Sequence, residues 1–509
     1  MLLFHIRQKE GMKMKKMWAI FLSFLMVLPP FGSFASEETA AIAPEGETEI
    51  FSNAEPATAQ EAKLEKQPEG YYLISTAEQF LQISNDLAGE YWITEDITLP
   101  ESFVPIGTGT ADGTSLTSKA PFTGKLLGKK ADGENAVLDV TIGSPEADYQ
   151  GIFGFLDGTV QNITVRGSVT ASKTAGGIAA LANSSAVIED CVNLASVTIS
   201  ASGNYVGGIV GYLRGKAVRC VNRGAISGVG VWGIGGVAGV AQYAGASLRN
   251  CVNEGTVTTT AYAPIGGVLG FGITDVTVAY CTNFGDVQGA RWSAVGGLGA
   301  VIQGTVQYCY NAGNISGGST TGGLLAYLQN SVVRNCFNAG NVTGGDSSAP
   351  SVGGVAGELG HSQSEKVNRL ENTYNIGKVA AAGAGGKLGG VYAAVEGPVT
   401  GLKNNYYLMQ NGLPTGGPSV PGFEDAIGAD EDGLAELAGS VFKFDPDGWE
   451  NSIADYDRYP FPTLHDNPYI PAIPYERPNL LSSAQMEGGF MEPAFDKNTR
   501  HYEIALPDD

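Results

Sequence analysis

Residues 207–226 read GGIVGYLRGKAVRCVNRGAI, and variants of this stretch return at regular intervals along the 509-residue chain. The stretch joins two motifs: a Gly-Gly pair followed by an apolar run, here from Gly207, and the pattern Cys-x-Asn-x-Gly-x-Val/Ile, here from Cys220. Six copies of the second motif start at Cys191, Cys220, Cys251, Cys281, Cys309 and Cys336, which are 29, 31, 30, 28 and 27 residues apart. Two more copies carry Ile163 and Thr373 in place of the cysteine. This repeat decides the fold.

A repeat of about 30 residues holds roughly three short strands with their turns, and one such unit cannot bury its own apolar face. Copies that stack in register bury these faces together as the coils of a solenoid. We therefore predict an all-β fold: a right-handed parallel β-helix, or β-solenoid, of about nine or ten coils with a short N-terminal capping helix. The Val or Ile that ends each motif, and the aliphatic residue after each Gly-Gly pair, should point inward.

The cysteines occupy one equivalent position in each coil, which predicts an inward ladder of thiols that behave as small hydrophobic groups. The replacements Ile163 and Thr373 fit packing rather than metal ligation. Disulfides between neighbouring coils are the alternative, since an exported protein can form them. A zinc site is disfavoured because no histidine accompanies the cysteines and no Cys-x-x-Cys occurs. We expect no metal and no cofactor.

A second ladder is predicted from the asparagine of each motif copy. Its members are Asn193, Asn222, Asn253, Asn283, Asn311, Asn338 and Asn375. Stacked asparagine amides can hydrogen-bond from coil to coil, and asparagine tolerates left-handed backbone at a corner. We expect this ladder to be structural.

Four aromatic residues precede successive Gly-Gly pairs by two to four residues: Tyr205, Trp232, Tyr262 and Trp292. If these rings are exposed, they form a stripe along one edge of four coils that could stack on sugar rings or anchor an extracellular protein. The alternative is that the rings only pack on one another over a turn.

The repeats resemble the GLUG-motif repeats of bacterial cell-surface proteins. The resemblance rests on GGIVGYL at Gly207 with CVNRGAI at Cys220, and on Glu-Asp-Ile at Glu95, Pro-Ile-Gly at Pro105 and Phe-Thr-Gly at Phe122. It covers roughly residues 70–465 and implies a β-helix similar to filamentous haemagglutinin, of a kind that often accompanies adhesins and surface proteases. The turn Leu127–Lys130 departs from the Asp-Gly-x-Gly usual in the family.

The ends of the chain add further segments. Lysines before the apolar run 18–28 and small residues before Ser36 are typical of a signal peptide. Ser75 with Glu78 predicts the capping box of a short helix. From Leu480 onward the sequence resembles the start of a cadherin-like β-sandwich. The predicted organisation is 1–35 signal peptide, 36–69 disordered acidic linker, 70–465 GLUG-type solenoid with caps, 466–479 Pro-rich linker and 480–509 truncated cadherin-like start.

Charge and apolar patterning limit the partners. Acidic residues number 52 and basic residues 30, a net charge of −22 that repels nucleic acid. There is no apolar stretch of about 18 residues, so we expect no transmembrane span. We place the protein outside the cell, on the surface of a bacterium of the Gram-positive type. Association with the cell wall would come from sequence beyond Asp509.

We find little sign of catalysis in the sequence. The acids of the repeat region do not recur at coil spacing with basic partners; they are Asp190, Glu254, Asp275, Asp286, Asp346 and Glu358. Only four histidines occur, and no nucleophile, zinc-protease or phosphate-loop motif is present. We predict an exported, non-catalytic solenoid that acts as an adhesion or stalk module. The competing hypothesis is a carbohydrate-active β-helix enzyme, or the accessory region of a larger surface protease.

Overall fold

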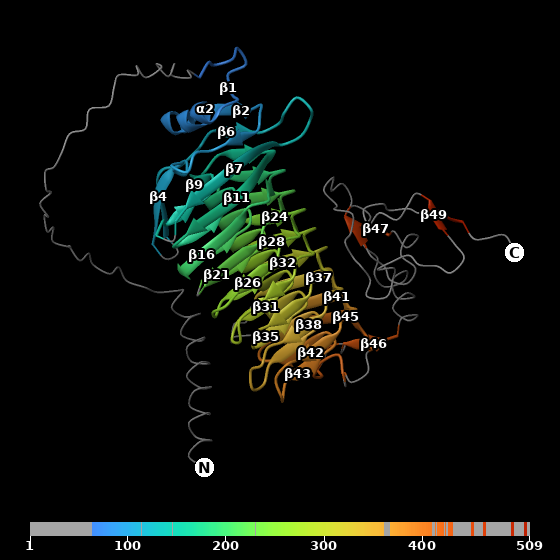
Figure 1. Cartoon of the computed structure of the whole chain (residues 1–509). Coiled ribbons are helices and arrows are strands. Elements are labelled where there is room, and N and C mark those ends of the chain that lie inside the picture. The colour runs from blue at the N-terminus through green and yellow to red at the C-terminus, as the bar shows by residue number, and fades with distance from the viewer. Residues whose placement is uncertain are drawn as a thin grey trace, which may run out of the picture. The chain divides into compact units, whose positions relative to one another are not determined.

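The protein is described from a computed structural model (Figure 1). It describes residues 64–409 apart from 113–114, 145, 230 and 361–366, and beyond these residues 413, 415–421, 423, 426–430, 449–451, 462–464, 490–492 and 503–505. The predicted signal peptide, residues 36–63 of the acidic linker, the Pro-rich linker and nearly all of the cadherin-like segment lie outside the described residues. The account below concerns the unit Lys63–Asp509.

A short helix stands at the start of the stack. Helix α2 spans Ala77–Leu81 and is followed by the 3₁₀ turn η1, Gln82–Asn85. The capping box lies one residue later than predicted: the Thr76 hydroxyl accepts from the Gln79 amide, and the Gln79 side chain accepts from the Ser75 amide at 2.8 Å. Phe80 is fully buried and anchors the helix on the first coils.

The solenoid strands form five parallel rows, each made of equivalent segments from successive coils. Row one precedes the Gly-Gly pairs, most of its strands ending at the first glycine of a pair, and it has nine strands, which sets the stack at nine full coils. Its members are β8 (Tyr149–Gln150), β12 (Thr174–Gly176), β17 (Tyr205–Gly207), β22 (Gly233–Gly235), β27 (Pro264–Gly266), β31 (Ala294–Gly296), β35 (Thr320–Gly322), β39 (Ser351–Gly353) and β43 (Lys387–Gly389).

Rows two and three follow the Gly-Gly pair, and β28 and β32 run through both. Row two consists of β9 (Phe153–Leu156), β13 (Ala179–Ala182), β18 (Val210–Leu213), β23 (Ala238–Gln242), β28 (Leu269–Ala279), β32 (Gly299–Gln307), β36 (Leu325–Leu328), β40 (Ala356–Leu359) and β44 (Tyr392–Val395). Row three adds β1 (Tyr72–Ile74), β2 (Glu90–Ile93), β6 (Lys125–Leu127), β10 (Thr159–Gln161), β14 (Val187–Glu189), β19 (Lys216–Val218), β24 (Ser247–Arg249), β37 (Ser331–Asn338), β41 (Arg369–Asn375) and β45 (Gly401–Leu408).

Rows four and five carry the Cys-x-Asn motif and its final aliphatic residue. Row four consists of β3 (Ile97–Thr98), β7 (Ala136–Gly143), β11 (Ile163–Ala171), β15 (Val192–Asn193), β20 (Val221–Asn222), β25 (Val252–Asn253), β29 (Thr282–Asn283), β33 (Tyr310–Asn311), the ends of β37, β41 and β45, and β46 (Ile427–Ala429). Row five consists of the ends of β7 and β11, β16 (Ser196–Ser202), β21 (Ile226–Val229), β26 (Val257–Thr259), β30 (Val287–Gln288), β34 (Ile315–Gly317), β38 (Val342–Gly344) and β42 (Val379–Ala381).

Three antiparallel pairs stand outside the rows. The hairpin of β4 (Thr108–Asp112) and β5 (Ser115–Ala120) replaces the row-two strand of the coil before β9, since Ile106 and Phe122 on either side of it bridge to Phe153 and Leu156. The other two pairs are β47 (Trp449–Asn451) with β48 (Pro462–Leu464), and β49 (Phe490–Glu492) with β50 (Glu503–Ala505).

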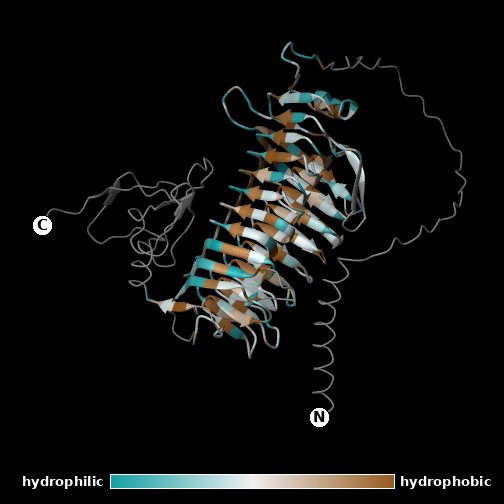
Figure 2. Cartoon of the chain, turned by 180° about the vertical axis from the view of Figure 1, so that it is seen from behind, coloured by the Kyte–Doolittle hydropathy of each residue, from teal (hydrophilic) through white to brown (hydrophobic). Residues whose placement is uncertain are grey.

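Strict register between coils builds one continuous core. Ile226 pairs with Val257, and Val257 with Val287, so the final aliphatic residues of the motif stack in line. These residues and the aliphatic residues after the Gly-Gly pairs, such as Ile209, belong to the buried core, as predicted. Figure 2 shows apolar residues recurring on successive strands along the stack. The parallel β-solenoid predicted from the repeat is confirmed.

The sharp corner before each cysteine uses left-handed backbone. The residue immediately preceding the cysteine position has φ between 50° and 57° in every copy: Asn162, Asp190, Arg219, Asn250, Tyr280, Tyr308, Asn335, Asn372 and Asn404. We predicted this conformation for the motif asparagine three positions later, such as Asn253, which instead lies in a row-four strand. The asparagine ladder therefore does not form the corner.

Candidate functional site

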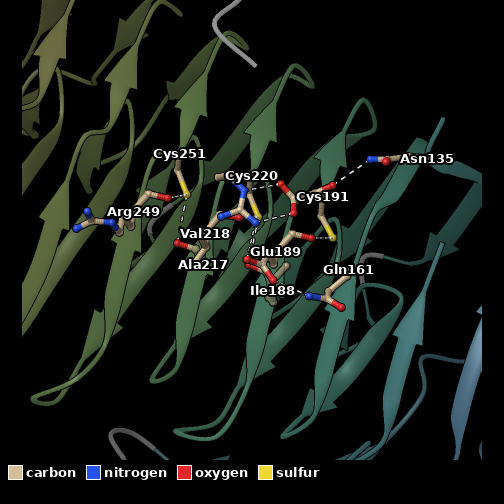
Figure 3. A network of polar contacts seen from close by, with 12 residues as sticks. Asn135, Gln161, Ile188, Glu189, Cys191, Ala217, Val218, Cys220, Arg249 and Cys251 are labelled. Carbon is tan, nitrogen blue, oxygen red and sulfur yellow. Dashed lines mark hydrogen bonds and ion pairs between the residues drawn. The ribbon is translucent and has the colours of Figure 1, made fainter. Parts of the chain in front are cut away.

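The six cysteines stack inside the solenoid. Each is at most 1% exposed, and all belong to the hydrophobic core. All six are free thiols. Each thiol donates to backbone carbonyls, as Cys220 does to Ile188 and Val218 at 3.4 Å (Figure 3). Burial raises the pKa of the Cys220, Cys281 and Cys309 thiols, which disfavours the reactive thiolate.

The motif asparagines form an uninterrupted chain of buried amides. In each of six steps the Nδ2 of one asparagine donates to the Oδ1 of the next, at 2.7–2.8 Å. The same nitrogen also donates to the carbonyl two residues on in its own coil, as Asn253 does to Gly255 at 2.8 Å. Each of these side chains is at most 1% exposed. Val165 and Tyr407 occupy the equivalent positions beyond Asn193 and Asn375.

The ladder explains why glycine recurs around it. A Cβ on the second glycine of a Gly-Gly pair would collide with the amide, as at Gly236, where Asn253 Cγ would lie 2.2 Å away. A Cβ on the motif glycine would meet the backbone of the preceding coil, as at Gly255, where Gly224 O would lie 2.0 Å away. These glycines let neighbouring chains approach closely.

At the corner between rows one and two, side chains on the outer face of row two are buried. Seven residues of row two lie in register here, are 0–7% exposed and do not belong to the interior core: Phe155, Leu181, Tyr212, Val240, Phe271, Val301 and Tyr327. Row one covers them from the side: the Tyr205 ring lies 5.1 Å from the Tyr212 ring, and Tyr327 donates to Thr320 at 3.0 Å. Burial raises the pKa of Tyr212 to about 12.

The predicted aromatic stripe divides into two parts. Tyr205 is the first residue of β17, is half-buried and packs against Tyr212 of row two. Trp232, Tyr262 and Trp292 lie in the turns before β22, β27 and β31 and remain 45%, 37% and 40% exposed. The offset follows from register, because Tyr205 lies opposite Gly233 rather than Trp232.

Trp292, one of the three exposed rings, sits beside a pair of opposite charges. The Arg291 guanidinium lies 5.1 Å from the Trp292 ring centre and pairs with Asp346 at 3.4 Å. Their side chains are 53% and 71% exposed. We call the group of Trp232, Tyr262, Arg291, Trp292 and Asp346 the corner patch. It is the strongest candidate for a binding site.

Another aromatic stack escaped the sequence analysis. The residue between cysteine and asparagine changes from valine in early coils to aromatic in late ones, and the Tyr310, Phe337 and Tyr374 rings stack at 4.8 Å with planes within 3°. These side chains are 1–8% exposed. Their regular spacing from Tyr310 onward was the signal that could have revealed them. They reinforce the coil-to-coil contact and leave little surface for a ligand.

Several acids weighed as catalytic candidates are engaged in ion pairs. The pairs are Asp190 with Arg219 at 2.7 Å, Glu254 with Arg223 at 3.1 Å and Asp346 with Arg291 at 3.4 Å. Asp286 accepts from Asn314, and Glu358 accepts from Thr320, while Asp275 lies within β28 in left-handed backbone, with φ 55°. His361, His465 and His501 lie outside the described residues.

The densest charged cluster centres on Arg219. Its guanidinium contacts Glu189 at 2.5 Å as well as Asp190, and Gln161 donates to the other oxygen of Glu189 at 2.5 Å (Figure 3). Hydrogen bonding to Asp190 raises the pKa of Arg219 further. Both carboxylates thus share one cation, unlike the separately tuned acid and base of a glycosidase. Among the residues with described positions, no group of three or more His, Cys, Asp or Glu could hold a metal ion.

No protein-family model and no curated protein sequence matches this chain. A candidate immunoglobulin A1 protease from Bacteroides ovatus is 15% identical, with 79% of this chain and 94% of that chain covered and a TM-score of 0.34. An IgA1 protease is 18% identical, with 60% of this chain covered and a TM-score of 0.35. The chain spans about a fifth of the length of that second protein, 21%. Similarity this low carries no argument about activity.

The class that the architecture defines is the parallel β-solenoid, with buried thiol and amide ladders. In the part of the chain that the structure describes, no helix is long and apolar enough to cross a membrane.

Proposed function

We propose that this chain is an exported, non-catalytic module of the bacterial cell surface, related to the GLUG-repeat proteins. In this role the solenoid is a rigid stalk and also carries an adhesive surface. A C-terminal cadherin-like segment would continue the array of surface modules.

The observation that carries the stalk role is the unbroken amide ladder from Asn193 to Asn375. Each coil is joined to the next by backbone pairing and by a buried side-chain hydrogen bond. Such a stack resists bending between coils, because displacing one coil leaves buried polar groups unpaired on both sides.

The non-catalytic role is supported by the state of the acids. Asp190, Glu254 and Asp346 are each held by an arginine. A glycosidase needs two carboxyl groups with separate tasks on either side of a substrate. The competing enzyme hypothesis would require a pair formed by carboxyl groups other than these three.

The test measures both where the protein is located and whether it cleaves polysaccharides. An epitope-tagged chain in its source bacterium should be processed after Ala35 and should be removed from intact cells by added protease. Purified chain should release neither reducing ends nor unsaturated uronates from a panel of plant and microbial polysaccharides. Retention inside the cell would overturn the surface role, and depolymerisation that survives repurification would establish the enzyme hypothesis instead.

A further inference from the structure

We propose that the corner patch binds a neutral, extended polysaccharide that lies along the solenoid axis; this inference rests on the adhesive role proposed above and names its ligand class. Among the described residues, four Trp and Tyr side chains are exposed, and the patch gathers three of them; the fourth is Tyr243. Exposed aromatic groups of this kind mark interaction sites.

The spacing of the rings matches a sugar chain. Pro264 pairs with Ala294, so Tyr262 lies opposite Trp292 one coil further on. Neighbouring coils are about 4.8 Å apart, close to the rise of about 5 Å per ring in an extended β-linked glycan. Trp232 lies one coil earlier but is offset by one residue, opposite Ala263 rather than Tyr262, because Ile234 pairs with Ile265. Tyr262 and Trp292 could therefore each face one of two consecutive sugar rings, and Trp232 extends the aromatic surface one coil earlier.

Polar groups at the edge of the platform suit hydroxyls. Arg291 lies over Trp292 and pairs with Asp346, and both side chains are more than half exposed. A guanidinium donates and a carboxylate accepts, so the pair can satisfy neighbouring sugar hydroxyls as the few polar groups of an apolar site usually do.

Charge favours a neutral ligand over an acidic one. The Asp346 carboxylate offsets the single cation of the patch, and the chain as a whole carries a net charge of −22. A polyanion such as a uronic acid polymer would therefore be repelled on approach.

Strand pairing argues against an extended peptide. Peptides that bind as strands add to an open sheet edge and gain main-chain hydrogen bonds there. The patch lies beside β22, β27 and β31, and each of these strands already pairs with a neighbour on both sides. A sugar chain needs only the exposed side chains.

The experiment is calorimetric titration of the whole chain with neutral hexasaccharides: cellohexaose, xylohexaose, mannohexaose and laminarihexaose. We expect at least one to bind. In the oligomer series of that sugar, affinity should rise from one to three sugar rings and change little beyond four. Hexagalacturonate should bind more weakly than the best neutral ligand. No binding by any neutral hexasaccharide with Kd below about 1 mM would overturn the proposal.

Variants assign the binding to the patch. The double variant Trp232→Ala, Trp292→Ala should weaken the best ligand about 10- to 100-fold, because two stacking platforms are lost. Trp292→Phe should keep most of the affinity. Tyr243→Ala removes a ring that is 42% exposed at another corner and is the matched control. Unchanged circular dichroism and unreactive thiols show that each variant is folded.

The outcomes separate this proposal from the adhesive role. Equal glycan binding by wild type and the folded double variant would overturn the corner patch as the site. If the chain binds matrix proteins such as fibronectin or collagen and no glycan, the adhesive role stands and the sugar ligand is wrong. If it binds glycans but never reaches the cell surface, the ligand class stands and the surface role is wrong.

Discussion

Replacing Asn253 by alanine should destabilise the solenoid far more than replacing a solvated asparagine. In the native chain the Asn253 amide accepts from Asn222 at 2.7 Å and donates to Asn283 and Gly255 at 2.8 Å. The substitution leaves three buried polar atoms short of one partner each. An unsatisfied buried group costs about 1–3 kcal/mol, so we expect a loss of about 3–5 kcal/mol after some relaxation.

The matched control is Asn341→Ala, which breaks a ladder of the same chemistry on the surface. Asn341 is exposed, donates to Asn314 at 3.1 Å and accepts from the Lys378 amide at 3.1 Å. Water can replace these bonds, so its loss should stay near 0.5 kcal/mol. Guanidinium unfolding followed by circular dichroism measures both. Equal losses for the two variants would refute the claim that buried amide pairing holds the coils together.

Three further predictions follow from the same ladders. In the variant Asn253→Asp, the new carboxyl group would face the acceptors Asn283 Oδ1 and Gly255 O, so its pKa should rise above the unfolded value of about 3.9. The variant should therefore lose stability relative to wild type as pH rises from about 4 to 7. A deficit in the unfolding midpoint that does not change with pH would contradict this. Gly255→Ala would place a methyl 2.0 Å from Gly224 O and should cost more than about 2 kcal/mol, whereas Gly401→Ala meets only flexible side chains at 3.3 Å and should be mild in the same assay. All six thiols should resist a bulky disulfide reagent at pH 8 and react once denaturant is added. Fast reaction of most of them in the native protein would show that the cysteines are not buried in the core.

The repeat alone was sufficient to predict the solenoid and the inward position of its aliphatic residues, because the period of the motif equals one coil. The left-handed corner was assigned to the wrong position. Its residues range from Asn250 to Arg219 and Tyr280, so no single residue type marks them in the sequence. Backbone conformation there is imposed by the coils on either side rather than by local preference.

The surface was harder to predict than the core. Outward Tyr212 and inward Leu213 are adjacent, and the skipped pairing at Gly211 breaks the alternation that would tell the faces apart. The burial of the outward row-two side chains, such as Tyr212, could therefore not be predicted from the sequence. The aromatic stripe was predicted from proximity to Gly-Gly, but Tyr205 is offset by one residue from Trp232 and lies apart from the exposed rings.

The offset in the capping helix has a similar local cause. Ser75–Glu78 and Thr76–Gln79 both fit the capping pattern, and the structure uses the second. Helix α2 then ends at Leu81, which is 41% exposed, whereas its neighbour Phe80 is fully buried.

The most direct test of the in-register solenoid is a distance measured before and after removal of one coil. Lys125 and Arg369 are exposed and lie on one line of row three, eight coil steps apart, or about 38 Å. Spin labels attached there by azide–alkyne coupling, which spares the cysteines, should give a narrow distance distribution by electron–electron double resonance. Deleting residues 221–251 joins Cys220 to Val252 and removes one coil, so the distance should fall by about 5 Å with the distribution still narrow. A broad distribution, or a folded deletion variant with an unchanged distance, would contradict the stacked-coil account.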